Sequence, residues 1–185
     1  MKIICPELAT ENILLRPIVP SDLDHIYQGL SHPDVIRYYG ISYKTRSATE
    51  AQMDWYQQIQ EEGSGVWWAI VSKEGTDFYG ACGLNDYSDV HLKAEIGFWL
   101  LPEYWGRGII ASAARLICDY AFSKMELHRI EAVVETANNN CKQVMQKLGF
   151  ALEGTLQDAE VKDDRFISLH LYALLNKQKP GSTVN

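Results

Sequence analysis

The sequence predicts a mixed α+β fold, in which helices flank a central twisted mixed sheet of about six to seven strands. Two amphipathic helical segments precede three strand-like segments, and a strand, a helix and a strand then form a crossover. The length of 185 residues suits one domain. We expect this domain to span residues 1–178, with residues 179–185 as a frayed tail.

The first part of the chain is expected to form one strand and two helices. Ile13–Arg16 reads as a strand that Pro17 ends. Ser21 is expected to cap a helix, and a loop from His32 to Gly40 follows it. Ser47–Glu50 has the form of a capping box that opens the second helix. The apolar positions of the two helices keep helical spacing: Leu23, Ile26, Tyr27 and Leu30, then Met53, Trp55, Tyr56 and Ile59.

The remainder of the chain alternates between strand-like and helix-like segments. A turn at Lys73–Asp77 joins the first two strands, and Gly149 lies just past the end of the last helix. The expected strands are 66–71, 78–84, 92–101, 129–134, 151–156 and 166–174, and the expected helices are 108–122 and 141–148.

Charge and composition exclude several classes of partner. A net charge of −7 and a pI near 5.2 argue against nucleic acid, which requires a clustered basic surface. No apolar run approaches the ~20 residues that cross a bilayer, so no membrane association is expected. The five histidines show no metal-ligand spacing, and we expect no metal. The four scattered cysteines are typical of reduced thiols, which predicts a cytoplasmic protein.

A glycine turn between a strand and a helix is the most informative local feature. Gly106 and Gly108 stand just before the expected helix, whose first backbone N–H groups have no helical partner. Glycines there allow an anion to approach the main chain closely, so the turn is a candidate phosphate site. Arg107 adds a positive charge or simply faces solvent. On spacing alone, a plain tight turn explains the two glycines equally well.

At these residues the sequence resembles the GNAT acetyltransferase superfamily, whose signature is Gln/Arg-x-x-Gly-x-Gly/Ala at the start of the central helix. Trp105–Ile110 occupies the six positions, and Gly108 matches the fourth. Trp105 followed by Gly106 is similar to the branch that acetylates ribosomal-protein N-termini and to its spermidine-acetylating relatives. Ile110 departs from the signature, which has a small residue there.

Further segments resemble the same branch in the same order, and the likeness covers about residues 10–176. The matching segments include Leu15–Pro17, Ala94–Leu100, Leu127–Ile130, Asn138 with Cys141, and Lys147–Phe150. The resemblance implies a GNAT fold and acetyl transfer from acetyl-CoA, a co-substrate, to a primary amine.

The resemblance also implies positions for acetyl-CoA. The backbone of Phe98, Trp99 and Leu100 would pair with the pantetheine arm like an added strand. The pyrophosphate would bind the amides of the glycine turn and of the helix start. These residues are Gly106, Arg107, Gly108, Ile109, Ile110 and Ala111. Asn138 would contact the arm of the coenzyme.

Three residues are candidates for proton transfer, which the reaction needs because alkyl amines are mostly protonated at neutral pH. Glu95 lies on the expected strand 92–101, which would line the coenzyme site, and it is the first candidate for the base. The alternative is that Glu95 pairs with a neighbouring strand. Glu160, in an expected loop after Leu156, is a second candidate base or a solvated charge. Cys141 stands where the branch has serine, and it is either a proton donor to the coenzyme sulfur or a packed thiol. Other members of the superfamily use a tyrosine as the proton donor, and Met145 occupies that position here.

The acceptor is the most open part of the prediction. Tyr38 and Tyr39 are candidate acceptor contacts, whereas Trp67 or Trp68 is expected in the core. A protein N-terminus of the ribosomal-protein type is the first candidate acceptor, and a small polyamine-like amine is the second. A sensor that binds acyl-CoA without catalysis is the alternative of a different class. The sequence allows a monomer or a homodimer.

Overall fold

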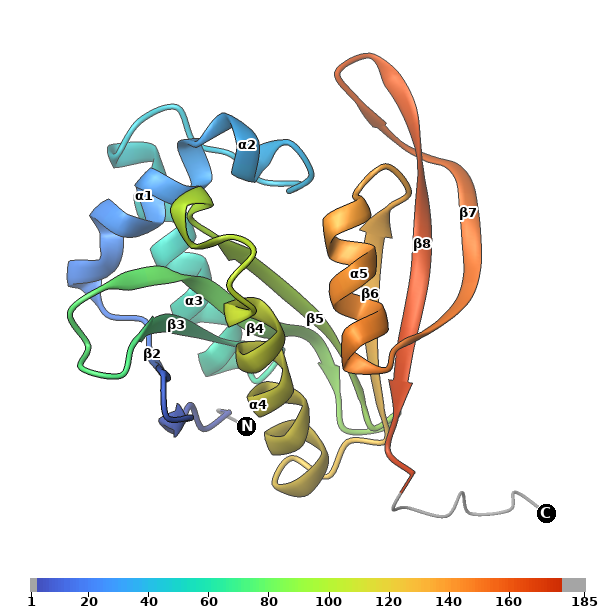
Figure 1. Ribbon diagram of the computed structural model, residues 1–185, viewed down its shortest axis with the longest axis horizontal. Helices are drawn as coiled ribbons and strands as arrows, with labels where there is room; N and C mark the ends of the chain where they lie inside the picture. The colour runs from blue at the N-terminus through green and yellow to red at the C-terminus, as the bar shows by residue number, and fades with distance from the viewer. Residues whose placement is uncertain (1–2, 178–185) are drawn as a thin grey trace.

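The computed structural model describes residues 3–177 and contains an eight-stranded mixed sheet with helices on both faces (Figure 1). The strands are β1 (Leu8–Ala9), β2 (Ile13–Pro17), β3 (Val66–Ser72), β4 (Phe78–Ser88), β5 (Lys93–Leu100), β6 (Arg129–Glu135), β7 (Ala151–Lys162) and β8 (Arg165–Leu175). The helices are α1 (Leu23–Ser31), α2 (Pro33–Ile36), α3 (Glu50–Glu62), α4 (Ile109–Ser123) and α5 (Asn139–Leu148). The predicted mixed α+β class is confirmed.

The strand order in the sheet is β1-β2-β3-β4-β5-β6-β8-β7. All neighbours are antiparallel except β5 and β6, which are parallel and joined through α4. This is the predicted strand–helix–strand crossover. Seven strands match predicted segments, and the eighth is the two-residue β1, which is too short to leave a periodic signal.

Neighbouring tryptophans of β3 serve the two faces of the sheet. Trp68 packs in the core beneath α4 and α5, together with Ile117 and Met145. Trp67 packs on the opposite face with Tyr56 of α3 and Trp99 of β5. The separation follows from the alternation of side chains along a strand. Both tryptophans are therefore core residues, which is one more than predicted.

The helix starts differ from the predicted caps. Ser21 does not cap α1, because Pro20–Asp22 forms a 3-10 turn in which the Asp22 carboxylate accepts from the Val19 N–H and pairs with Arg16. The Ser47 capping box is also absent, because Ser47–Thr49 is a 3-10 turn. There the Thr45 hydroxyl accepts from the Ala48 N–H. The expected loop after α1 contains α2, which begins at Pro33 in the position that proline favours.

Glu160 lies in a strand and not in the predicted loop. β7 continues to Lys162 through an irregularity between Leu156 and Glu160, and Glu160 pairs with Ile167 of β8. The connection to β8 is a tight turn at Asp163 and Asp164, whose φ angles are 50° and 58°. The second half of β7 is polar and carries no apolar alternation, because both faces of the strand are largely exposed.

The predicted frayed tail, residues 179–185, lies outside the described residues. The single-domain boundary at residue 178 stays a prediction. Within residues 3–177, no helix combines the length and the apolar character needed to span a membrane.

The Trp99 side chain of β5 packs directly against the backbone of α1 at Gly29. Its indole is 4% exposed and lies against Gly29, where an added Cβ would stand 2.0 Å from the ring carbon Cζ3. A glycine is therefore required at this position for α1 to reach the sheet.

Gly29→Ala is expected to destabilise the fold by about 1–3 kcal/mol, because the new methyl group displaces the Trp99 ring. The loss outweighs the ~1 kcal/mol that alanine adds to a helix. Urea unfolding measures the change, with Gly40→Ala as a control, since no heavy atom lies within 4 Å of a Cβ there. A Gly29→Ala protein as stable as the wild type would contradict this packing.

Candidate functional site

The sheet opens between β5 and β6. The two strands pair only at Lys93–Glu95 and Arg129–Glu131, and they separate beyond these residues. β5 continues to Leu100 with β4 on its other side, while β6 continues to Glu135 beside β8. Among the described strands, none covers the inner edge of β5 from Ile96 to Leu100. Such an edge can pair with an extended ligand through main-chain hydrogen bonds.

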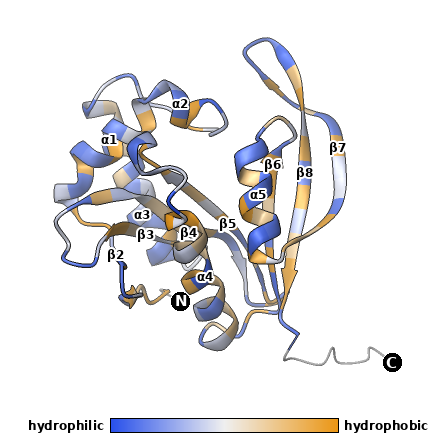
Figure 2. Ribbon diagram, in the orientation of Figure 1, coloured by the Kyte–Doolittle hydropathy of each residue, from blue (hydrophilic) through white to orange (hydrophobic). Residues whose placement is uncertain are grey.

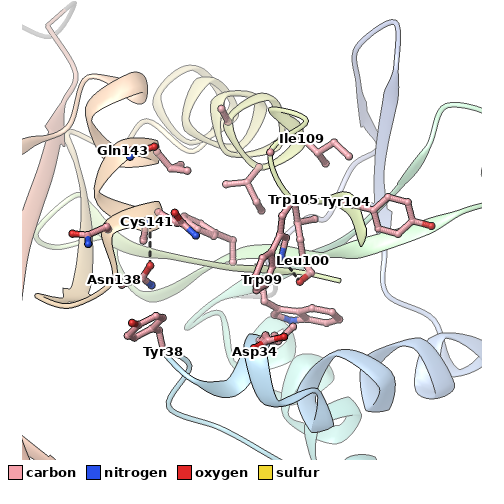
Figure 3. Close-up of a pocket in the computed structure, with 18 of the residues that line it drawn as sticks. Asp34, Tyr38, Trp99, Leu100, Tyr104, Trp105, Ile109, Asn138, Cys141 and Gln143 are labelled. Carbon is pink, nitrogen blue, oxygen red and sulfur yellow. Dashed lines mark hydrogen bonds between the residues drawn. The ribbon is translucent and has the colours of Figure 1, made fainter. Parts of the chain in front are cut away.

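A cavity of about 690 Å³ lies along this open edge (Figure 3). Its walls come from four parts of the chain: the α2 segment, the end of β5, the glycine turn with the start of α4, and α5 with the residues before it. Tyr38 and Asn138 lie toward one end of the cavity, and Tyr104 lies toward the other (Figure 3). A cavity of this size is in the range of small-molecule and coenzyme sites.

Most of the predicted coenzyme contacts surround this one cavity. The lining includes Phe98, Trp99, Leu100, Gly106, Gly108, Ile109, Ile110, Ala111 and Asn138, together with the proton-donor candidate Cys141. Arg107 lines an adjoining hollow of about 400 Å³, which shares Gly108 and Ala111 with the cavity. Glu95 and Glu160 line neither space. The structure therefore brings the coenzyme candidates together, and their contacts with a ligand stay a prediction.

The glycine turn has the backbone geometry of an anion site. Gly106 and Gly108 have φ angles of 74° and 76°, in the left-handed region that favours glycine. Gly108 is the N-cap of α4, and its carbonyl accepts from the Ser112 N–H. The amides of residues 109–111 therefore precede the first helical hydrogen bond and stand at the positive end of the helix dipole.

Basic side chains gather around this helix start. Lys147, in the last turn of α5, has its Nζ 3.9 Å from a Cβ built on Gly108. Arg115 of α4 donates to the Lys147 carbonyl at 3.3 Å, and both residues line the hollow with Arg107. Neither Lys147 nor Arg115 was among the residues expected to contact an anion. A lysine in the last turn of a helix is common, and only the fold brings it to the start of α4.

Two hydrogen bonds shape the cavity walls (Figure 3). The Trp105 indole donates to the Leu100 carbonyl at 2.9 Å, so this carbonyl already has a partner. The Cys141 N–H donates to Oδ1 of Asn138 at 3.1 Å, which makes Asn138 the N-cap of α5. The amide Nδ2 of Asn138 is then the group available to donate to a ligand.

Cys141 is half-buried at the start of α5. Burial raises the pKa of its thiol to about 12, so the thiol stays protonated at neutral pH. A thiol with this pKa is a weaker acid than an ordinary alkyl thiol. It can donate a hydrogen bond to a nearby sulfur, but complete proton transfer to a thiolate is unfavourable.

Glu95 lies at the last paired position before the strands separate, beside Glu131 of β6. Burial raises the pKa of Glu95 to about 7, and the carboxylates of Asp86, Glu131 and Glu160 add to the shift, whereas Lys93 opposes it. A group with this pKa exchanges protons readily at neutral pH.

Glu131 behaves in the opposite way, although it stands beside Glu95. Burial acts to raise the pKa of Glu131, but hydrogen bonds from Arg129 at 2.6 Å and Lys93 at 3.0 Å outweigh it and lower the pKa. The two adjacent carboxyl groups therefore have different pKa values: that of Glu131 is lowered, and that of Glu95 is raised to about 7.

The aromatic candidates separate into two groups. Tyr38 and Tyr39 line the cavity, as the acceptor hypothesis requires. Burial raises the pKa of Tyr39 well above its ordinary range, so its hydroxyl is a hydrogen-bond donor at neutral pH. Trp55 packs edge-on against Trp67 at 6.1 Å and lies outside the cavity lining. No group of three or more metal-binding side chains occurs within residues 3–177.

The profile of the family described as "Acetyltransferase (GNAT) domain" matches residues 12–151. The chain belongs to the GNAT acetyltransferases. This GNAT protein is 31% identical to the N-acetyltransferase p20 of Bacillus licheniformis, over 94% of its own length and 98% of that relative. Its relatives are named N-acetyltransferases, and the predicted enzyme class is confirmed.

Relatives with both kinds of acceptor are similar to this GNAT protein. The spermidine N(1)-acetyltransferase of Escherichia coli K12 is 27% identical and aligns over 80% of this chain and 77% of its own length. The solved structure of the ribosomal-protein-S5-alanine acetyltransferase from Vibrio fischeri superposes with a TM-score of 0.83 at 20% identity, covering 95% of this chain and all of that one. The family therefore establishes acetyl transfer and leaves the acceptor open.

Asp86→Asn in this GNAT protein is expected to lower the pKa of Glu95 below its wild-type value of about 7, because Asp86 is the nearby charge with the largest effect. The pKa should remain above the ordinary glutamate range, since burial is unchanged. Carboxyl-carbon NMR titration measures it, and Asp89→Asn, in the exposed turn after β4, is the matched control. Equal Glu95 pKa values in both variants would refute the assignment.

Proposed function

We propose that this GNAT protein transfers an acetyl group from acetyl-CoA to a primary amine, with the cavity along β5 as the coenzyme site. The observation that carries the proposal is the meeting of the open β5 edge with the start of α4 in one cavity. An extended arm that ends in a pyrophosphate fits this combination, because the strand edge pairs with the arm and the helix start binds the anion.

We assign each part of acetyl-CoA to one wall of the cavity. Backbone groups of Phe98–Leu100 bind the pantetheine arm, with the Leu100 carbonyl already occupied by Trp105. The amides of residues 106–111 hold the pyrophosphate, and Arg107, Arg115 and Lys147 supply positive charge beside it. Asn138 donates from Nδ2 to the arm.

The bound acetyl-CoA supplies the activated acetyl group, and the chain supplies the proton transfers. Glu95 is the proposed base, which takes a proton from the ammonium of the acceptor, directly or through a water molecule, so that the neutral amine attacks the thioester carbonyl. Its pKa of about 7 allows it both to accept this proton and to release it at neutral pH. Glu160 serves as a neighbouring negative charge that helps to raise this pKa, and not as a second base. Cys141 donates a hydrogen bond toward the leaving sulfur.

The first candidate acceptor is a protein N-terminal amine of the ribosomal-protein type, as in the relatives with such names. A small polyamine is the second candidate, because Asp86 and Glu160 add negative charge near Glu95, which attracts a polycation. The proposed location is the cytoplasm, since four free cysteines suit a reducing compartment.

A panel of acceptors tests the proposal. Release of free thiol from acetyl-CoA is followed with peptides that begin with serine or alanine and with spermidine, and mass spectrometry identifies the acetylated product. Turnover of peptides alone supports the N-terminal acceptor, and turnover of spermidine alone supports the polyamine. Tight acetyl-CoA binding without turnover of any amine would overturn acetyl transfer and favour a sensor.

Glu95→Gln is expected to lower kcat/KM by about 10²–10⁴-fold, because the base is lost, while the affinity for acetyl-CoA changes little. In the wild type, kcat/KM rises with pH through about 7 as Glu95 loses its proton, and this limb disappears in the variant. Glu74→Gln, in the exposed turn between β3 and β4, is the control. A variant that keeps the wild-type rate and profile excludes Glu95 as the base.

Lys147→Met is expected to weaken acetyl-CoA binding by about tenfold, the scale of one charge-assisted hydrogen bond, with a smaller effect on kcat. Isothermal titration measures the affinity, and raised salt should weaken the wild type more than the variant. Lys124→Met, at the exposed end of α4, should bind like the wild type. If both variants bind equally well, Lys147 does not contact the phosphates.

A further inference from the structure

Lys162 connects two walls of the cavity from outside its lining. Its ammonium donates to the Arg37 carbonyl at 2.6 Å and to Oε1 of Glu135 at 2.5 Å. Arg37 follows α2 and Lys162 is the last residue of β7, while Glu135 ends β6. This arrangement, the Lys162 bridge, joins three segments that are remote in sequence.

The two bonds reach opposite sides of the same opening. Arg37 and the next residue, Tyr38, line the cavity on the α2 side. Ala137 and Asn138, shortly after Glu135, line it on the α5 side. Between residues 23–46 and residues 129–175, the bond from Lys162 to Arg37 is the one hydrogen bond or ion pair that joins the two sides. It is therefore the direct polar link across the opening at the Tyr38 end.

Polar contacts, and not apolar burial, hold the hairpin tip at this position. The tip of the β7–β8 hairpin is hydrophilic (Figure 2). Its nearest apolar residues, Val161 and Phe166, are 65% and 70% exposed. In contrast, the side chains of Lys162 and Glu135 are only 25% and 14% exposed. Removal of the ammonium would leave the Glu135 carboxylate largely buried without a cation, which is costly.

We propose that Lys162 is a positioning residue for acetyl transfer, which holds the α2 wall against the β6–α5 wall and excludes water from the Tyr38–Asn138 end of the cavity. This inference rests on the proposed function, because excluding water matters only if an acetyl thioester is held there. Lys162 does not line the cavity and takes no part in proton transfer. Its effect is on the width of the opening through which the acceptor enters.

Hydrogen exchange tests the bridge without any turnover. In Lys162→Met, which keeps the length of the side chain and loses its charge, amides of residues 33–39 and 136–141 should exchange about tenfold faster, the scale of one hydrogen bond to a charged group. Lys162→Arg should restore slow exchange, since a guanidinium donates to both oxygens. Lys73→Met, in the exposed β3–β4 turn, is the matched control. Wild-type exchange in Lys162→Met would overturn the proposal.

The kinetic readout separates positioning from general damage. Thiol release and acetylated amine are counted in the same reaction, and Lys162→Met should raise the share of acetyl-CoA hydrolysed without product and raise the acceptor KM several-fold. Acetyl-CoA affinity should change less than the acceptor KM, because Asn138 is the one proposed coenzyme contact on the loosened walls, whereas Phe98–Leu100 and the α4 start are unchanged. Faster exchange with an unchanged product ratio would overturn the role in excluding water. If the wild type acetylates no amine, the proposed function fails, and hydrogen exchange still reports on the bridge.

Discussion

The early end of pairing between β5 and β6 is the constraint on which the cavity depends. Three paired positions hold the two strands together, and beyond Glu95 the chain of β5 runs on with one edge open. The same strand then leads through Gly106 and Gly108 into α4. A single connection thus creates both an unpaired strand edge and an exposed helix start, and it aligns them on one side of the sheet. The cavity is a consequence of this topology, and the side chains refine it.

The electrostatics of the site depends on the same junction. Parallel register places Glu95 and Glu131 next to each other, where like charges disfavour two ionised carboxylates. Arg129 and Lys93 stabilise the charge on Glu131, and Arg129 also pairs with Glu153. Glu95 has the less favourable environment of the two. The pKa of Glu95 is therefore raised by burial first and by neighbouring carboxylates second, while the cations beside it stabilise Glu131 instead.

Much of the fold was predictable because its long helices and strands have clear apolar periodicity. The turn before α4 was predictable because it contains Gly106 and Gly108, and glycine is the residue that adopts positive φ angles most readily. Most of the coenzyme candidates that line the cavity come from one stretch of sequence, Phe98–Ala111, and their contacts with a ligand stay a prediction. Features without a local signal were missed. Glu160 was assigned to a loop because a strand exposed on both faces carries no alternation. Lys147 and Lys162 gain their positions only through contacts with residues distant in the chain, which no window of sequence contains.

The order of the last strands links the cavity to the way the chain is synthesised. β8 follows β7 in the chain but lies between β6 and β7 in the sheet. On the ribosome, β7 emerges with no strand to pair with, and β6 has only its short contact with β5 until β8 arrives. The amino-terminal helices and β1–β5 can assemble earlier, because their neighbours in the sheet are also neighbours in the chain. The nascent protein therefore acquires one wall of the cavity before the strand that supports the other, and the cavity is complete only after β8 has inserted.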